Sequence, residues 1–258
     1  MPLTTEEWHR RFFQQTRWTS ALRQHIYQHT RLKDSQHILE VGAGTGAVLS
    51  AVLSELPPDA TNHFFGLDIN KSFLQFTRNQ LPDVILTQGD GHHLPYISAS
   101  FDAAFCHFLL LWVDNPSLVL KEMIRVTRPK GSVIALAEPD YGGRIDYPLE
   151  LAEIGKLQTM SLNQQGADTN LGRKLAGLFS SAGLTNIEFG ILGGQWYTND
   201  LDDETQSEWV IIQNDLSGLI SDNRITQLRQ LEFTAKSTGE RVLYIPTFYA
   251  FGQVPGLN

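Results

Sequence analysis

The sequence predicts an α/β fold, a doubly wound and mostly parallel β-sheet with helices on both faces. Short apolar segments rich in Val, Ile, Leu and Phe alternate with helical segments of about ten residues between 37 and 137. Most of these segments end at a Gly, Asp or Pro turn signal. A chain of 258 residues can bury a substantial core, and this alternation calls for right-handed crossovers between parallel strands.

The N-terminal half carries the regular part of this pattern. In its first helix, apolar residues such as Trp8, Leu22 and Ile26 recur along one face. Pro57 and Pro58 end the second helix, because proline cannot continue one. The helices are predicted at 5–31, 47–56, 71–80 and 118–126, and the strands at 37–41, 62–67, 83–88, 101–106 and 132–137.

The C-terminal part departs from simple alternation. Gly183 is expected to stop a helix, Asp222 to cap the second of two helices, and Pro246 to mark an edge or a bulge in the last strand. The expected helices lie within 170–182 and 203–237, and the expected strands at 186–192 and 242–251.

Composition argues against several classes of function. The formal net charge of −8 argues against a surface built to bind nucleic acid or an anionic membrane. Cys106 is the sole cysteine, so no internal disulfide or cysteine metal cluster is expected, and the adjacent His92 and His93 point apart. We therefore expect no metal site. The N-terminus lacks the apolar region of a secretory signal, and the longest apolar run, 108–113, is too short to span a membrane, which predicts a cytoplasmic protein.

The strongest chemical signal is the turn after the first strand, residues 42–46. Its glycines allow a tight turn and let a ligand approach the backbone without a Cβ in the way. Gly42, Gly44 and Ala47 also satisfy the dinucleotide fingerprint G-x-G-x-x-G/A. The turn alone therefore predicts a nucleotide-like ligand without identifying it.

Four motifs follow one another in order along the chain: ILEVGAGTG at 38–46, GLDI at 66–69, GDG at 89–91, and FDAAF at 101–105 with LKE, RV and RPKG up to 131. Each is weak alone, whereas the ordered set with these spacings is specific. From about residue 36 to residue 137 the sequence resembles the class I S-adenosylmethionine-dependent methyltransferases, and a continuation to 251 agrees with that family.

The resemblance implies a seven-stranded sheet with an antiparallel last strand, in a single methyltransferase domain over 1–258. An N-terminal helical cap, 1–34, would precede a cofactor-binding half, 35–138. The substrate-side half, 139–258, would carry a helical insertion at about 200–239, and the cap and insertion would form a lid. The implied reaction moves a methyl group from S-adenosylmethionine to a small organic acceptor by in-line displacement, leaving S-adenosylhomocysteine.

Three acidic residues lie where that cofactor would need acceptors. The resemblance implies that Asp68 binds the ribose hydroxyls and Asp90 the adenine amino group, although each can also cap a helix or turn. Glu40 lies in an apolar strand, where an unpaired carboxylate is costly, so its partner is the cofactor's ammonium, directly or through water, or an amide of the turn. The predicted cofactor-binding residues are Glu40, Gly42, Ala43, Gly44, Gly46, Asp68, Ile69, Asp90, Gly91 and His107.

The catalytic assignment is less determined, because methyl transfer needs a general base only when the acceptor arrives protonated. His107, at the end of the fourth strand, is the best base candidate, and packing explains a histidine there equally well. The loop after the fifth strand gathers charged and phenolic groups where substrates are held. Aromatic residues of the cap and insertion line a lid as a group, while each one alone is explained by packing. The predicted catalytic residues are His107, Asp140 and Tyr141, and the predicted substrate residues are Phe13, Trp18, Trp112, Tyr141, Arg144 and Trp196.

Three alternatives stay open. An NAD-dependent oxidoreductase is supported by the fingerprint and Asp68, and opposed by Gly46, Asp90 and the strand at 242–251. A non-catalytic member would bind cofactor and transfer nothing. A protein methyltransferase is the third, although the Asn-Pro-Pro-Tyr signature of many DNA and protein amide methyltransferases is replaced by Cys-His-Phe-Leu at 106–109. The oligomeric state is open.

Overall fold

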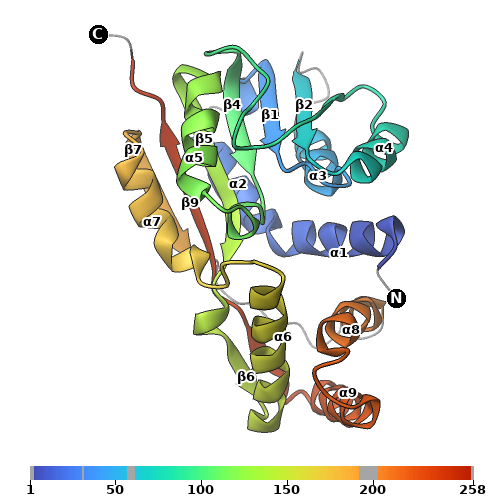
Figure 1. The fold of residues 1–258 in the computed structure, drawn as a ribbon. Helices are drawn as coiled ribbons and strands as arrows, with labels where there is room; N and C mark the ends of the chain where they lie inside the picture. The colour runs from blue at the N-terminus through green and yellow to red at the C-terminus, as the bar shows by residue number, and fades with distance from the viewer. Residues whose placement is uncertain (1–2, 31, 57–61, 192–202, 257–258) are drawn as a thin grey trace.

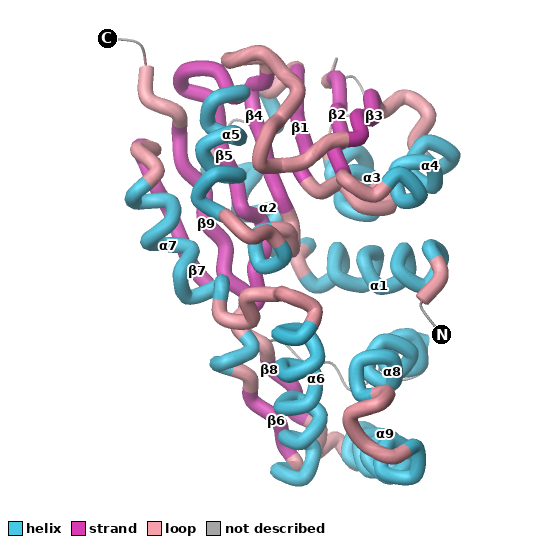
Figure 2. The backbone as a smooth tube through the Cα atoms, viewed as in Figure 1, coloured by secondary structure: helices cyan, strands magenta, loops and turns pink. Residues whose placement is uncertain are grey.

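A computed structural model describes residues 3–30, 32–56, 62–191 and 203–256, and its centre is a seven-stranded sheet (Figure 1, Figure 2). The strand order is β3-β2-β1-β4-β5-β9-β7. Neighbouring strands from β3 to β5 pair in parallel, and β9 pairs antiparallel with both β5 and β7. The predicted α/β fold with an antiparallel last strand is confirmed. The strands are β1 His37–Val41, β2 His63–Asp68, β3 Ile85–Gln88, β4 Phe101–Cys106, β5 Thr127–Pro139, β7 Thr185–Ile191 and β9 Thr247–Gln253.

Helices cover both faces of this sheet. One face packs against α5 Pro116–Val126 and α7 Leu171–Ser181, and the other against α2 Ser20–His29 and α3 Ala47–Glu55. Helix α4, Lys71–Gln80, packs beside β2 and β3. The direction of strand order reverses between β1 and β4, and a doubly wound sheet binds its ligands outside the carboxyl ends of the strands at that point.

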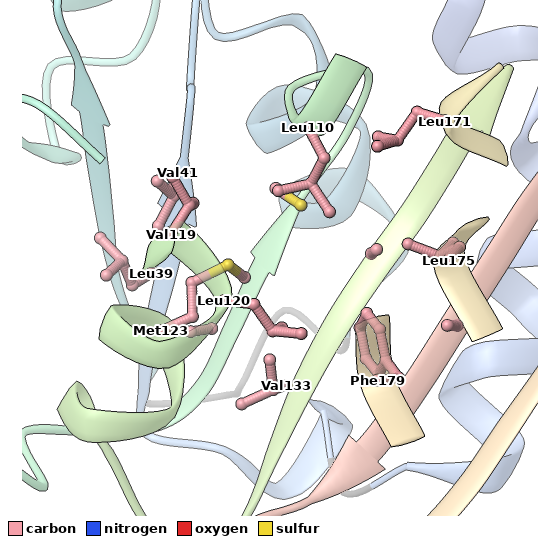
Figure 3. Packing of buried hydrophobic residues seen from close by; sticks show 14 of the residues in the cluster. Leu39, Val41, Leu110, Val119, Leu120, Met123, Val133, Leu171, Leu175 and Phe179 are labelled. Atoms are coloured by element: carbon pink, nitrogen blue, oxygen red, sulfur yellow. The ribbon is translucent and has the colours of Figure 1, made fainter. Parts of the chain in front are cut away.

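Strand β1 is buried on both sides, as a central strand of a covered parallel sheet must be. Leu39 and Val41 belong to the core beneath α5 and α7, whereas Ile38 belongs to the core beneath α2 and α3. Figure 3 shows Leu39 and Val41 beside Val119 and Met123 of α5. This alternation follows from the two-residue period of a strand, and each fully buried apolar side chain contributes about 1.5–3 kcal/mol.

A smaller unit lies below the sheet in Figure 1 and has a core of its own. Trp209, Leu151 and Leu228 are buried in that core, so Trp209 packs its helix instead of facing a ligand. Helix α1, Thr5–Trp18, lies between the sheet and this unit and contacts α3 and α8 (Figure 1). The unit consists of β6 Ile145–Tyr147, α6 Ala152–Gln164, α8 Asp203–Leu216, α9 Asp222–Ser237 and β8 Val242–Tyr244. None of the helices in the described ranges is both long enough and apolar enough to cross a membrane.

The predicted helix over 5–31 proves to be two helices, α1 and α2, separated at Thr19. The Thr19 hydroxyl donates to the carbonyl oxygen of Gln15 at 3.1 Å, and Arg23 Nη1 donates to that of Thr16 at 2.6 Å. Side chains thus satisfy the last carbonyl groups of α1, which lets the chain change direction there.

The predicted strand over 242–251 is also divided. Strand β8 pairs with β6 in the small unit, whereas β9 enters the large sheet. Pro246 lies in the gap because it has no N–H for a ladder, and its carbonyl accepts the Asp140 N–H at 2.8 Å. Ser221 caps α9 and Asp222 is its first residue, which corrects the predicted cap. Helix α6 was not anticipated from the sequence.

Candidate active site

The turn after β1 requires the glycines that the sequence places there. Gly42, Gly44 and Gly46 have φ angles of +78°, +52° and +76°, in the left-handed region that side chains disfavour. The N–H groups of Gly42 and Ala43 both donate to the carbonyl oxygen of Leu67, at 2.8 and 2.9 Å. These hydrogen bonds fix the turn to the end of β2, and the turn forms one wall of a pocket.

The pocket has a volume of about 160 Å³ and lies at the carboxyl end of β1. Its walls come from the glycine turn, the ends of β2 and β4, and the helices α1, α3 and α4. Most of the side chains facing it are apolar or aromatic, and two are acidic. The lining residues are Phe12, Gln15, Glu40, Gly42, Ala43, Gly44, Ala47, Val48, Asp68, Phe73, His107, Phe108, Leu109 and Trp112.

Glu40 is the most unusual residue of the pocket. Its side chain is 1% exposed, and its Oε2 atom has no hydrogen-bond partner in the part of the chain that the structure describes. Burial, together with the nearby Asp68 carboxylate, raises the pKa of Glu40 well above its usual value. A buried carboxylate oxygen without a hydrogen-bond partner is costly in an apolar site, and a cationic ligand would remove that cost.

Asp68 lies beside Glu40 at the end of β2. Its Oδ2 accepts the Gly44 N–H at 2.8 Å, and its Oδ1 accepts the Asn70 N–H at 2.7 Å. Burial raises the pKa of Asp68, against the lowering effect of these backbone donors. The Asn70 side chain caps α4, so the carboxylate of Asp68 is not needed for that cap. Each oxygen keeps a lone pair for a ligand hydroxyl.

These features fit S-adenosylmethionine, which carries an ammonium, a sulfonium and a ribose but no phosphate. Glu40 offers an acceptor for a cation, Asp68 offers acceptors for hydroxyl groups, and most of the remaining lining is apolar. Asp68 suits the ribose of either cofactor, whereas the orphaned carboxylate oxygen of Glu40 has nothing to bind on the pyrophosphate of NAD. The pocket therefore disfavours the dinucleotide alternative.

Four other predicted cofactor residues, Gly46, Ile69, Asp90 and Gly91, are not among the residues that line this pocket. Ile69 follows Asp68 and is 70% exposed. Asp90 accepts from His92, whose ring Nδ1 lies 2.7 Å from the Asp90 carboxylate, and these contacts lower the pKa of Asp90. At Gly91 a Cβ would come within 3.2 Å of Val41, so the backbone there packs closely against β1. Their roles toward a cofactor stay predictions.

His107 does line the pocket, at the end of β4. Its Nε2 lies 3.3 Å from the Thr19 hydroxyl, which links the sheet to the break between α1 and α2. Burial, with a further effect of the Arg23 cation, lowers the pKa of His107 to about 3. A histidine this reluctant to accept a proton is poorly matched to general-base catalysis at neutral pH. Its position is that of a neutral wall residue.

Asp140 and Arg144 do not face the pocket, and each is held by other side chains. Arg173 and the backbone N–H groups of residues 143 and 173 donate four hydrogen bonds to the Asp140 carboxylate, between 2.5 and 3.1 Å. These bonds occupy its lone pairs and leave none for a substrate, so the geometry gives the catalytic role predicted for Asp140 no support, and that role stays a prediction. Arg144 is 5% exposed and donates to Asp146 at 2.7 Å, and also to Gln158, so it supports the small unit.

The orientation of helix α1 decides which of its aromatic side chains face the pocket. Phe12 lines the pocket, whereas Phe13 and Trp18 are 50% and 45% exposed and lie outside its lining. A Cβ at Gly44 would come within 3.3 Å of the Phe12 ring, so α1 packs directly on the glycine turn. Trp112 lines the pocket and is 43% exposed, and its role as a substrate contact stays a prediction.

Tyr141 is half-buried against the core and does not line the pocket. Burial raises its pKa, with smaller opposing effects of the Arg11 and Arg144 cations. Trp196 lies outside the described residues. Cys106 is fully buried, as expected for a small apolar core residue, and its pKa is raised well above its usual value by burial and nearby carboxylates.

Sequence reasoning missed the role of Glu138 at the end of β5. Its carboxylate accepts the backbone N–H groups of Leu109, Leu110 and Leu111 at 3.1, 2.8 and 3.3 Å. Burial raises the pKa of Glu138 to about 8, although those donors work in the opposite direction. The loop that Glu138 holds supplies Leu109 and Trp112 to the pocket. The sequence signal for this role was an acidic residue in the apolar segment that ends β5.

Comparison with known proteins agrees with this geometry. The sequence profile of a family described as a methyltransferase domain matches residues 39–135. The chain is 31% identical to demethylmenaquinone methyltransferase of Bacillus velezensis over 196 residues, 69% of this chain and 82% of that one. It is 35% identical to the enzyme of the same name from Renibacterium salmoninarum, over 42% of this chain and 44% of that one.

Among solved structures, phosphoethanolamine N-methyltransferase 2 of Haemonchus contortus, in complex with S-adenosylhomocysteine, shares the fold. The TM-score is 0.54 at 16% identity, over 86% of this chain and 49% of that one. The chain spans less than half the length of several curated relatives that it matches, 44% and 47% in two of them. The sheet order, the acidic cofactor pocket and these matches together show that the chain belongs to the class I S-adenosylmethionine-dependent methyltransferases.

Proposed function

We propose that this chain binds S-adenosylmethionine at the carboxyl end of β1 and transfers its methyl group to a small organic acceptor. The observation that carries the proposal is a pair of acids, the buried Glu40 and the half-buried Asp68, in a mostly apolar pocket beside a glycine turn. A dedicated cation site without phosphate-binding groups is what a sulfonium amino-acid cofactor needs.

Four side chains have distinct proposed roles toward the cofactor. Glu40 would accept from the ammonium group, and Asp68 from the ribose hydroxyls. Ile69 and Asp90 would contact the adenine ring and its amino group, since both follow strands whose carboxyl ends open toward the pocket edge. When bound, the cofactor supplies a methyl group activated by the adjacent sulfonium.

Helix α1 is the proposed cover of the site. Phe12 and Gln15 project from it into the pocket lining, and His9 Nδ1 lies 2.9 Å from the Thr45 hydroxyl of the glycine turn. Phe12 also meets Phe73 of α4 edge to face, with ring centroids 5.8 Å apart. Side chains packed in this way exclude water, which strengthens the electrostatic contacts of Glu40 and Asp68. This arrangement supports the proposed division into cap, cofactor half and substrate half.

The acceptor is proposed to enter in a form that is already nucleophilic. Among the pocket-lining residues that the structure describes, His107 is too weakly basic to take a proton, and Glu40 and Asp68 are assigned to the cofactor. An acceptor that is ionised near neutral pH, such as an acidic phenol or enol, needs no protein base. The exposed ring of Trp112 at the pocket rim favours a flat, apolar molecule.

The test is S-adenosylhomocysteine release from S-adenosylmethionine with two matched sets of acceptors, acidic phenols and enols against simple alcohols of similar size. Turnover with the first set, absent in Asp68→Ala, supports the proposal. Turnover confined to alcohols would contradict the acceptor class. Cofactor binding without turnover on any acceptor would favour the non-catalytic alternative.

A further inference from the structure

We propose that His25, His29 and Glu188 form a binding site for Zn²⁺ that joins helix α2 to the edge of the sheet. One ligand atom from each residue lies within 4.8 Å of the other two. His25 and His29 are four residues apart on α2, so both project from the same face of the helix. Glu188 comes from β7, the strand at the edge of the sheet.

One ring nitrogen of His29 is already engaged by the backbone. Its Nδ1 lies 2.9 Å from the carbonyl oxygen of His25. A carbonyl can only accept, so Nδ1 carries the proton and the lone pair remains on Nε2. Metal-binding histidines characteristically donate their second ring N–H to such a group, which fixes both tautomer and orientation.

The other two proposed ligands, His25 and Glu188, lie within hydrogen-bonding distance of each other. His25 Nε2 lies 2.6 Å from Glu188 Oε1, and the Tyr249 hydroxyl donates to the same oxygen at 3.0 Å. A zinc ion takes the place of the proton shared by His25 and Glu188. Zinc–ligand bonds of about 2.0–2.1 Å place tetrahedral ligand atoms about 3.3 Å apart, so small side-chain rotations complete the site.

Two imidazoles with one carboxylate select a borderline metal over Mg²⁺, which prefers oxygen ligands and octahedral geometry. The second histidine also separates this site from an ordinary ion pair, since Glu188 needs only His25 for that. His25 and Glu188 are half-buried, His29 is exposed, and none of the three lines the cofactor pocket. The fourth coordination position therefore faces solvent and would be filled by a water molecule, which makes this an open three-ligand site.

The site has a structural consequence for the cap. It connects residues 163 apart in sequence, His25 and Glu188, across α2, β7 and β9. Helix α2 also carries Arg23. Thr19, the residue immediately before this helix, contacts His107 in the pocket wall. Zinc bound to the folded state alone therefore stabilises the whole chain by mass action.

The experiment uses the full chain without a histidine tag, stripped of metal by chelation and exchanged into chelator-free buffer. Zinc is titrated by calorimetry, and thermal unfolding is followed with Zn²⁺ and with Mg²⁺. We expect one zinc per chain and a rise in melting temperature of about 5–10 °C at a free zinc concentration about 100 times Kd. Mg²⁺ is expected to give no rise. Co²⁺ is expected to give the intense visible bands of a tetrahedral site.

The matched variants are His29→Gln and Glu188→Gln, with His63→Gln as the control at an exposed histidine on β2. His29 is exposed, so its variant is expected to fold, and circular dichroism verifies this. The site variants are expected to lose the zinc-dependent rise, whereas His63→Gln keeps it. A wild-type protein without stoichiometric binding, or a His29→Gln variant that binds zinc as tightly as wild type, would overturn the proposal.

Discussion

The carboxylate of Asp68 accepts the backbone N–H of Gly44 at 2.8 Å, which ties the end of β2 to the glycine turn that follows β1. Because Gly44 sits at a φ of +52°, its N–H points away from the usual path of a strand and needs an acceptor. One side chain thus both shapes the turn and faces the pocket, and a substitution there affects both roles.

Replacing Asp68 is expected to weaken cofactor binding by removing acceptors for the ribose hydroxyls. Hydrogen bonds to a charged group contribute about 1.5–3 kcal/mol, so Asp68→Ala should lower affinity for S-adenosylhomocysteine by about 10–100-fold. Asp68→Asn keeps one acceptor and should lose less. Calorimetric titration measures both, with Asp83→Ala on the surface as the control. Unchanged affinity in Asp68→Ala would disprove the assignment.

Glu40→Gln is expected to separate stability from binding. The folded pKa of Glu40 lies above its unfolded value, so the folded state holds a proton longer, and the wild type loses stability as pH rises through that interval. The neutral amide does not titrate, so without cofactor the variant should be at least as stable as wild type at pH 8. Its affinity for S-adenosylhomocysteine should fall by about tenfold or more, because an acceptor for the ammonium becomes neutral.

Thermal unfolding and calorimetry on the same preparation test both parts of that prediction. A variant that is less stable at pH 8 and binds normally would show that Glu40 serves the fold through a partner other than the cofactor.

Glu138 is expected to make stability depend on alkaline pH. Its folded pKa is about 8, whereas an unfolded glutamate titrates near about 4.3, so the folded state binds the extra proton between these values and stability falls as pH rises. For one such group the loss between pH 7 and pH 9 is about 1.4 kcal/mol. Glu138→Gln keeps an acceptor for Leu109 and Leu110 and should lack this loss.

Urea unfolding of wild type and Glu138→Gln at the two pH values gives the difference directly, and other titrating groups cancel. Glu150→Gln, at an exposed position, should behave as wild type. Equal pH dependence in wild type and Glu138→Gln would contradict the assignment.

His107 is expected to contribute little as a base. With a pKa of about 3 it stays neutral from pH 5 to pH 9, so kcat/KM should show no inflection near 6.5 that depends on it. His107→Gln can still form a hydrogen bond with Thr19, so turnover should stay within about tenfold of wild type. Loss of a true general base would lower turnover by about 10²–10⁴-fold. A loss beyond a hundredfold together with a shifted pH profile would restore His107 as the base.

The cofactor side of the site could be predicted because its signals are local in sequence. Gly42, Gly44 and Gly46 mark a turn that only glycine makes easily, and Glu40 and Asp68 stand out in sequence as acids at the ends of otherwise apolar strands. Strand period and turn residues then place all of them at one edge of a parallel sheet.

The remaining roles depend on contacts between distant segments, which the sequence does not reveal. In the sequence, Asp140 is an acidic residue in a loop, and nothing there indicates that Arg173 of α7 donates hydrogen bonds to it. Phe12 and Phe13 are adjacent residues of the same type. Only the rotation of α1 about its axis, which turns Phe12 toward the glycine turn, distinguishes their roles. The spacing of His25 and His29 was visible, but the third ligand comes from the far edge of the sheet.

The most direct test of the central claim is thermal unfolding of the wild-type protein with S-adenosylhomocysteine and with NAD. At about 100 times its Kd, a ligand adds roughly 2.7 kcal/mol, or about 5–10 °C for a chain of this size. We predict that rise with S-adenosylhomocysteine and none with NAD. A rise with NAD alone, or with neither ligand, would contradict the assignment of the acidic pocket to S-adenosylmethionine.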